Sequence, residues 1–364
     1  MKAAVAIGLI LAACGPHGAS SASMEMNSPP SRAGPDADRS SGPIASRLER
    51  ARDGDTIALP PGTYAGNLIA DVNFAHGVTV TSADPDNPAV LNDLTVTHSA
   101  GITFRGLSFQ VPVPAPSKTP FTVKGASERV AFVSDRFLGD PVFLHDDKGP
   151  RGLFIRGSSD ISVTGSDFTQ LTVGIEHDND RDLTISDNYF HELHLRGIAG
   201  GGTNGLNITH NRFTGFFPNP KGLHPDVIFI WTTPAEEGGD RINISGNTIW
   251  RGDGAFVQGI MVSGTVSQRR GGPPITNLTI DGNKVYGMDF NGLRVAGVEN
   301  LAITNNQVVG YCDRLSKIVA GGVKGAQTIK GNRAQRFNVG GFNAFPPAGN
   351  AGSGCVSPKS GEPR

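Results

Sequence analysis

The sequence has little of what typifies helical, nucleic-acid-binding or zinc-binding proteins. Only 18% of its 364 residues are charged and 7% are aromatic, which fits a protein of strands and turns better than a helical one. The formal net charge is −1 with both signs mixed, so the basic surface of a nucleic-acid-binding protein is missing. The cysteines and histidines show no zinc-binding spacing. The chain has instead 49 glycines and many asparagines.

The first segment, MKAAVAIGLILAAC, has an apolar stretch from Ala3 to Ala13 that is too short for an ordinary membrane-spanning helix. Its end, Leu11-Ala12-Ala13-Cys14, resembles the lipobox of bacterial lipoprotein signal peptides. That resemblance implies an exported protein that is lipidated at Cys14 and held at the periplasmic face of the outer membrane or at the cell surface. An ordinary cleaved secretory signal is the alternative, and it also implies export.

Four segments follow from the composition. We expect a signal peptide at 1–13, a disordered tether rich in Gly, Ser and Pro at 14–42, one folded domain at 43–345 and a C-terminal tail at 346–364. Cys312 and Cys355 form an even pair in an exported chain, which favours a disulfide between them. Two free thiols are the alternative.

A repeat organises the folded domain. Strand-like segments such as ISVTGSDF (161–168), LNITHNRF (206–213) and LTIDGNKV (278–285) alternate apolar and polar residues, turn at an Asn or Asp, and re-enter the core with another apolar residue. Stacked asparagine side chains can form a hydrogen-bonded ladder, so we interpret the turn asparagines as structural. They are Asn188, Asn211, Asn247, Asn283, Asn306 and Asn332.

The repeat length predicts the architecture. A bare coil runs 22 or 23 residues, as from Asn188 to Asn211, and most copies are followed by a second short strand. That pattern predicts an all-β, single-stranded right-handed parallel β-helix of about ten coils. Residues 44–56, with apolar side chains on one side, predict a short helix that caps the N-terminal end of the solenoid.

Two segments resemble a known family. DTIALPPGTYAGNL (55–68) and GITFRGLSF (101–109) resemble the first and second coils of the pectate-lyase-like superfamily, notably the polysaccharide lyases that include chondroitinase B and some alginate lyases. The resemblance implies cleavage of a uronate-containing polysaccharide. The lysine and arginine pattern associated with catalysis in chondroitinase B is not recognisable in this sequence, so the resemblance does not fix the reaction.

The repeat is interrupted at two consecutive coils. Asn211 to Asn247 and Asn247 to Asn283 each span 36 residues, against 23 from Asn283 to Asn306. In each coil the insertion lies partly before and partly after the second strand, so we expect the insertions to wall a groove. The strand HPDVIFIW (224–231) would form its floor, with Asp226 at the position that glycine holds in neighbouring coils.

Alternation predicts which side chains face this groove. If Val227 points inward, the outward columns are Glu176, Ala199, Ile228, Met261 and Arg294, followed by Asp178, Gly201, Ile230, Ser263 and Ala296. His177 then falls at an inward position, so we expect its segment to leave the strand early. His191 and His194 fit solvated loop positions better than a metal site.

These positions suggest an enzyme that acts on an acidic polysaccharide by β-elimination or C5 epimerisation. Both reactions need a base, a group that neutralises the uronate carboxylate and an acid. We expect His224 to be the base, Arg294 or Arg196 to neutralise the carboxylate, and Asp226 to orient His224 or hold Ca²⁺ with Glu176. The expected substrate-binding residues are Lys221, Glu176, Asp178, Arg196, Trp231 and Met261.

Two other functions stay open. Asp226 paired with Glu176 or Asp178 would suit a glycoside hydrolase. A non-catalytic polysaccharide-binding or adhesin solenoid would need no ionisable cluster. In each case the expected partner is an acidic polysaccharide or oligosaccharide, the expected contact with a membrane is the lipid anchor alone, and the chain is expected to be a monomer.

Overall fold

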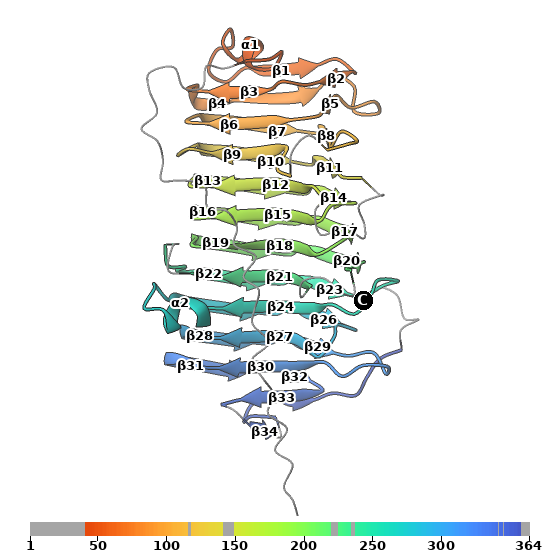
Figure 1. Cartoon of the computed structure of the whole chain (residues 1–364), viewed down its shortest axis with the longest axis vertical. Helices are drawn as coiled ribbons and strands as arrows, with labels where there is room; N and C mark the ends of the chain where they lie inside the picture. The colour runs from red at the N-terminus through yellow and green to blue at the C-terminus, as the bar shows by residue number, and fades with distance from the viewer. Residues whose placement is uncertain are drawn as a thin grey trace, which may run out of the picture. The chain divides into compact units, whose positions relative to one another are not determined.

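A computed structural model describes residues 41–115, 118–140, 149–219, 225–233, 237–340, 342–344 and 346–357. These residues form a right-handed parallel β-helix in which each coil contributes one strand to each of three sheets (Figure 1). The sheets contain 11, 12 and 12 strands, so the solenoid is slightly longer than the sequence predicted. Within the described part of the chain, no helix is both long and apolar enough to cross a membrane.

Sheet A holds the strand of greatest functional interest and runs down the middle of Figure 1. Its strands are β3 (Leu68–Ala70), β6 (Leu94–Thr97), β9 (Phe121–Lys124), β12 (Arg151–Arg156), β15 (Val173–Asp178), β18 (Arg196–Gly201), β21 (Asp226–Trp231), β24 (Gln258–Ser263), β27 (Asn291–Ala296), β30 (Lys317–Gly321), β33 (Arg336–Val339) and β34 (Phe342–Ala344). All neighbours pair in parallel except β33 and β34, which pair antiparallel at the C-terminal end.

Sheets B and C complete each coil. Sheet B contains β1 (Thr56–Leu59), β4 (Asn73–Ser82), β7 (Ala100–Arg105), β10 (Glu128–Val133), β13 (Ser159–Thr164), β16 (Arg181–Ser186), β19 (Asn204–Thr209), β22 (Ile242–Ser245), β25 (Ile275–Asp281), β28 (Val298–Thr304) and β31 (Lys324–Lys330). Sheet C contains β2 (Thr63–Tyr64), β5 (Val90–Leu91), β8 (Ser108–Gln110), β11 (Arg136–Leu138), β14 (Asp167–Thr169), β17 (Tyr189–Leu193), β20 (Arg212–Phe216), β23 (Thr248–Trp250), β26 (Lys284–Tyr286), β29 (Gln307–Val309), β32 (Arg333–Ala334) and β35 (Ala351–Gly352).

The core consists of identical positions stacked from coil to coil. Neighbouring parallel strands lie about 4.8 Å apart, so aromatic rings at one position of successive coils stack face to face. The clearest stack lies inside sheet C, with neighbouring ring centroids 4.5 to 4.8 Å apart. Its members are Phe109, Phe137, Phe168, Phe190 and Phe213, all fully buried.

The asparagine ladder is present, as the repeat predicted. Asn247 is typical: its Oδ1 accepts from the backbone N–H of Asn211 at 2.9 Å, and its Nδ2 donates to the carbonyl of Ile208 at 2.8 Å and to Oδ1 of Asn283 at 2.9 Å. The ladder extends to Asn350. The left-handed residue of each turn is the one before the asparagine, for example Asp187 with φ of 59°. The ladder asparagines therefore do not themselves adopt the left-handed conformation.

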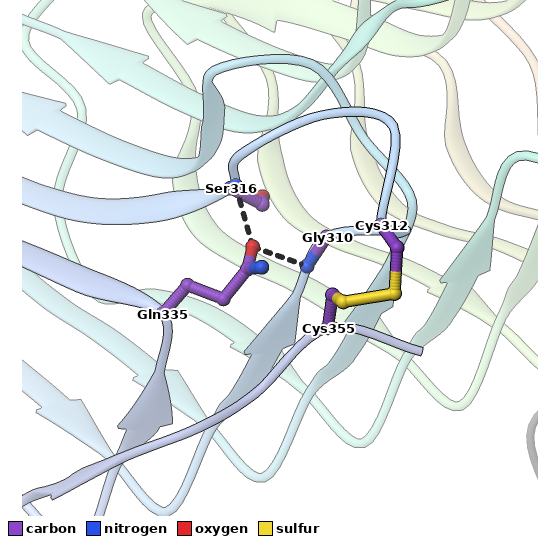
Figure 2. Close-up of a disulfide and its surroundings, with 5 residues drawn as sticks. All are labelled: Gly310, Cys312, Ser316, Gln335 and Cys355. Carbon is purple, nitrogen blue, oxygen red and sulfur yellow. Dashed lines mark hydrogen bonds between the residues drawn. A yellow bond between two sulfur atoms is a disulfide. The ribbon is translucent and has the colours of Figure 1, made fainter. Parts of the chain in front are cut away.

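A short helix and a disulfide mark the two ends of the solenoid. At the N-terminal end lies α1 (Ala45–Leu48), which buries Ala45 and Leu48 and is shorter than expected, because turns follow it before β1 begins at Thr56. At the C-terminal end a disulfide joins Cys312 to Cys355, with their Cα atoms 4.9 Å apart (Figure 2). This confirms the predicted pairing.

The two long coils place their extra residues at both ends of sheet A strands. Residues 217–225 precede β21 and 232–241 follow it, whereas 251–257 precede β24 and 264–274 follow it. The last of these contains α2 (Thr265–Arg269). The insertions therefore precede and follow β21 and β24 along the chain, as the spacing predicted.

Candidate functional site

The register of β21 differs from the prediction by one residue. Asp226 pairs with Gln258, and Ile228 pairs with both Ile198 and Ile260. Val227, not Asp226, therefore holds the position of the neighbouring glycines. The predicted outward pair Ile228 and Ile230 is buried in the core, and Phe229 and Trp231 take the outward positions instead. The apolar run VIFI has no alternation that could have fixed this register.

The corrected register defines three rows on the outward face of sheet A. The first row lies at the strand starts and contains Arg151, Val173, Arg196, Asp226, Gln258, Asn291, Lys317 and Arg336. The second row contains Phe154, Glu176, Ala199, Phe229, Met261, Arg294 and Val319. The third row contains Arg156, Asp178, Gly201, Trp231, Ser263, Ala296 and Gly321.

Charged residues of alternating sign meet on four consecutive strands, β12 to β21. Arg151 forms an ion pair with Glu176, whose side chain is 14% exposed. Burial raises the pKa of Glu176, although Arg151 and Arg196 oppose the shift. Burial lowers the pKa of Arg196, and the charges of Asp226 and Glu176 oppose that shift. Arg196 thus lies within the field of both carboxylates, and the strands bring together three of the residues that the sequence singled out.

An aromatic surface adjoins this ionic cluster. The Phe229 and Trp231 rings are tilted against each other with centroids 5.0 Å apart, and both side chains are partly exposed. The Arg196 guanidinium lies 4.9 Å from the centroid of Phe229, within the range of a cation–π interaction. Met261 is paired with Phe229 on the next strand. Partly exposed rings and a thioether provide apolar area against which a sugar ring can pack.

Asp178 extends the charged region at the strand ends. Its Oδ2 lies 3.1 Å from Nε of Arg156, on the preceding strand. Burial raises the pKa of Asp178, and Arg156 opposes that shift. The acids of this face are therefore each matched by an arginine.

The histidines do not join this cluster where the structure describes them. His177 points into the core, its Nδ1 lies 2.8 Å from the Thr203 hydroxyl, and burial lowers its pKa to about 3. The expectation that its segment leaves the strand early was wrong, because β15 continues to Asp178. His191 lies in β17 of sheet C, 3.3 Å from Asp167. His194 is buried beside the carbonyl of Phe217, so neither is the solvated loop residue expected.

Some predicted residues cannot be placed. His224, Lys221 and Cys14 lie outside the described residues. The described residues contain no group of three or more His, Cys, Asp and Glu side chains arranged for a metal ion. The charge of Arg196 interacts with the carboxylates of both Asp226 and Glu176.

A second cluster, formed by cations alone, lies further along the face. Arg294 is on β27, two strands beyond Asp226, and is therefore not part of the ionic cluster. Lys317 and Arg336 follow on β30 and β33 and are directly paired in register. Burial and the charges of Arg294 and Arg336 lower the pKa of Lys317. Lys317 and Arg336 belong to no pattern in the sequence, because only the pairing of the last coils brings them together.

The fold and its charged outward face define a polar β-helix solenoid. The sequence model of the right-handed β-helix region matches residues 151–334, about half of the chain. The chain belongs to this family. A search of curated protein sequences finds no match.

Solved structures show the same fold at low identity. The surface adhesin PfbA of Streptococcus pneumoniae is 12% identical with a TM-score of 0.54, covering 86% of this chain and 87% of that one. The Dettilon tailspike protein is 13% identical with a TM-score of 0.53, and this chain spans only 63% of its length while 86% of this chain is covered. An alginate lyase from Paenibacillus sp. str. FPU-7 is 17% identical with a TM-score of 0.45, over 85% of this chain and 96% of that one.

Proposed function

We propose that this protein is an exported, polysaccharide-active β-helix that binds an acidic polysaccharide on the outward face of sheet A and acts on its uronate residues. The observation that carries the proposal is the juxtaposition of Glu176, Arg196 and Asp226 beside the rings of Phe229 and Trp231. Ionisable groups beside an apolar surface are what a sugar-processing site needs, because the rings bind the sugar and the charged groups act on it.

The proposed chemistry starts with removal of the proton at C5 of a uronate. Arg196 neutralises the substrate carboxylate, which makes that proton more acidic. His224, two residues before Asp226 in the sequence, takes the proton. Asp226 orients the base.

Glu176 completes the set as the acid. Its raised pKa favours the protonated form, which can give a proton to the glycosidic O4 as the C4–O4 bond breaks and a C4–C5 double bond forms. That sequence is β-elimination. Return of a proton to C5 from the opposite side, with the C4–O4 bond intact, would be C5 epimerisation.

A glycoside hydrolase is the second candidate. Glu176 and Asp226 lie on strands separated by one intervening strand, about 10 Å across the sheet, and Glu176 aligns with Phe229, three residues along β21 from Asp226. Their backbones are therefore more than about 10 Å apart, and the two side chains would have to extend toward each other. Inverting glycosidases use an acid with a raised pKa and a second carboxylate roughly 6.5 to 9.5 Å away. The raised pKa of Glu176 favours this alternative as well.

Export and anchoring form a further part of the proposal. The lipobox-like residues before Cys14 support lipidation, which would hold the protein at a membrane surface exposed to polysaccharide. One structure with the same fold is a surface adhesin, which is consistent with a role outside the cytoplasm.

The test is incubation of the full chain with a panel of uronate polysaccharides in deuterated water. Ultraviolet absorbance of an unsaturated product identifies a lyase, incorporation of deuterium at C5 without cleavage identifies an epimerase, and new reducing ends without unsaturation identify a hydrolase. Binding with none of the three reactions would overturn the enzymatic proposal and leave a polysaccharide-binding solenoid.

A further inference from the structure

We infer that Arg294, Lys317 and Arg336 form a separate anion-binding subsite. The polysaccharide that fits both sites carries acidic groups on several sugars and extends along the solenoid axis toward the last coils. The inference rests on the proposed polysaccharide function and names a property of its substrate. It assigns these residues to binding and not to the reaction.

The three cations lie on three neighbouring strands of one face. Lys317 and Arg336 are directly paired in the register of β30 and β33, and Arg294 is on β27. Strands of one sheet are about 4.8 Å apart, so the backbones of β27 and β33 are separated by about 10 Å. An extended polyanion that follows the axis would therefore meet positive charge at successive positions.

No acid compensates these charges in the part of the chain that the structure describes. Arg151, Arg156 and Arg196 each lie beside a carboxylate on the same face. In contrast, none of the three cations of the subsite forms an ion pair with a described acid. The acids nearest in sequence pair with other cations: Asp289 lies 3.7 Å from Arg314, Asp313 lies 2.7 Å from Arg251, and Glu299 lies 3.8 Å from Lys324.

Two details indicate that the cluster is prepared for an anionic ligand. The Nε atom of Arg294 is buried without a hydrogen-bond partner among the described residues, a costly state that an anionic oxygen within reach could relieve. Burial and, to a smaller extent, the neighbouring charges of Arg294 and Arg336 destabilise the charged form of Lys317, which lowers its pKa. An anion bound among the three cations would remove that repulsion.

Phe290 supplies an apolar surface at the same place. Its ring is 55% exposed and lies 3.9 Å from Nζ of Lys317. Its φ of 29° is unusual for a residue other than glycine, and such strain persists only where the surroundings impose it. Lys317 can contact the carboxylate of a uronate while the exposed ring of Phe290 contacts the apolar face of the same sugar.

The experiment measures binding of the full chain to polygalacturonate, to dextran sulfate and to neutral dextran by titration calorimetry. The test variant combines Arg294→Gln, Lys317→Gln and Arg336→Gln. The control variant removes the same charge from exposed positions on the other two sheets, through Lys284→Gln, Lys330→Gln and Arg333→Gln. An exposed ion pair contributes at most about 1 kcal/mol. We therefore expect that the three substitutions of the test variant together lower the affinity for a polyanion by about tenfold or more.

The arms of the experiment separate the possibilities. Preference for polygalacturonate identifies carboxylates as the ligand, and preference for dextran sulfate identifies sulfate esters. The test variant should also lose most of the salt dependence of binding, whereas the control should keep it. Equal losses in both variants, unchanged affinity in the test variant, or no binding of any polyanion by the wild type would each overturn the subsite. Binding that depends on the three cations, without any reaction on the polysaccharide panel, would refute the catalytic proposal and leave the subsite in place.

Discussion

Arg151 and Glu176 form an ion pair between the neighbouring strands β12 and β15, on the outward face of sheet A. The pair affects the protonation of the proposed acid. Burial raises the pKa of Glu176 above its ordinary value, and the charge of Arg151 opposes this shift more than that of Arg196 does. The pH range in which Glu176 can donate a proton therefore depends in part on a residue one strand away.

The first prediction concerns that range. If Glu176 is the acid, activity falls as the pH rises through its pKa, because only the protonated form can donate. Arg151→Gln removes a charge that lowers this pKa, so the alkaline limb of kcat/KM should move to higher pH. Glu176→Gln should lower kcat by about 10² or more. Arg156→Gln, which removes the partner of Asp178, should leave the limb in place. An unshifted limb in Arg151→Gln would exclude Glu176 as the group reported by that limb.

The second prediction concerns the proposed base and the residue that orients it. Asp226→Asn keeps the shape of the side chain and removes its charge, while His224→Ala removes the base. Each should lower kcat by at least about 10², the lower end of what a positioned general base contributes. Asp182→Asn is the matched control, because Asp182 is an exposed acid on sheet B. Full activity in folded Asp226→Asn and His224→Ala proteins would remove both residues from the site.

The fold could be predicted because each coil repeats the same physical solution. The turn asparagine has to meet the asparagine of the next coil, so its spacing measures the coil length directly. The register of β21 could not be obtained in this way. Insertions on both sides of the strand remove the spacing as a guide, and Val227 to Ile230 are apolar whether they point inward or outward.

The histidines and the cationic cluster show a second limit of prediction from the sequence alone. His177 fits inside the solenoid because Gly200 of the next coil leaves room against its ring, which a local pattern around His177 does not reveal. Lys317 and Arg336 are 19 residues apart and belong to no motif. Only the pairing of β30 with β33 makes them neighbours.

The third prediction tests the ladder. Asn247→Ala leaves the buried N–H of Asn211 without its acceptor and the carbonyl of Ile208 without its donor. Each unsatisfied buried group costs about 1 to 3 kcal/mol, so the free energy of unfolding should fall by roughly 3 kcal/mol. Lys284→Ala, an exposed position on β26, should change it by less than about 0.5 kcal/mol. Denaturant titration followed by circular dichroism measures both, and similar values for the two variants would argue against a structural ladder.

The fourth prediction concerns the anchor. Labelled palmitate should be incorporated into the wild-type chain in a bacterial host and should be absent from Cys14→Ser. Detergent should be needed to release the wild type from membranes but not the variant. Equal labelling of both chains would show that Cys14 is not the lipidated residue.

The fifth prediction follows from a buried acid at the turn position of an early coil. Asp135 accepts hydrogen bonds from the backbone N–H groups of Leu107 and Val133, yet burial raises its pKa to about 8. The folded protein therefore holds a proton between about pH 4 and pH 8 that the unfolded chain has released. Because stability rises with pH only where the unfolded state binds more protons, this group makes the free energy of unfolding fall as pH rises toward 8 and level off above it.

Asp135→Asn cannot ionise, and its amide can donate to a carbonyl of the preceding coil as Asn188 does to Val163. The variant should match the wild type near pH 5 and exceed it at pH 9 by at least about 1.4 kcal/mol, the equivalent of one pKa unit. The free energy of unfolding of the variant should still fall somewhat as the pH rises, because burial also raises the pKa of Asp180, to about 7. His177, whose pKa is lowered, affects stability only below about pH 6.5, so the comparison is best made from pH 6.5 to pH 9. Denaturant unfolding across that range is the measurement, and parallel curves for the two proteins would show that Asp135 is ionised in the folded state.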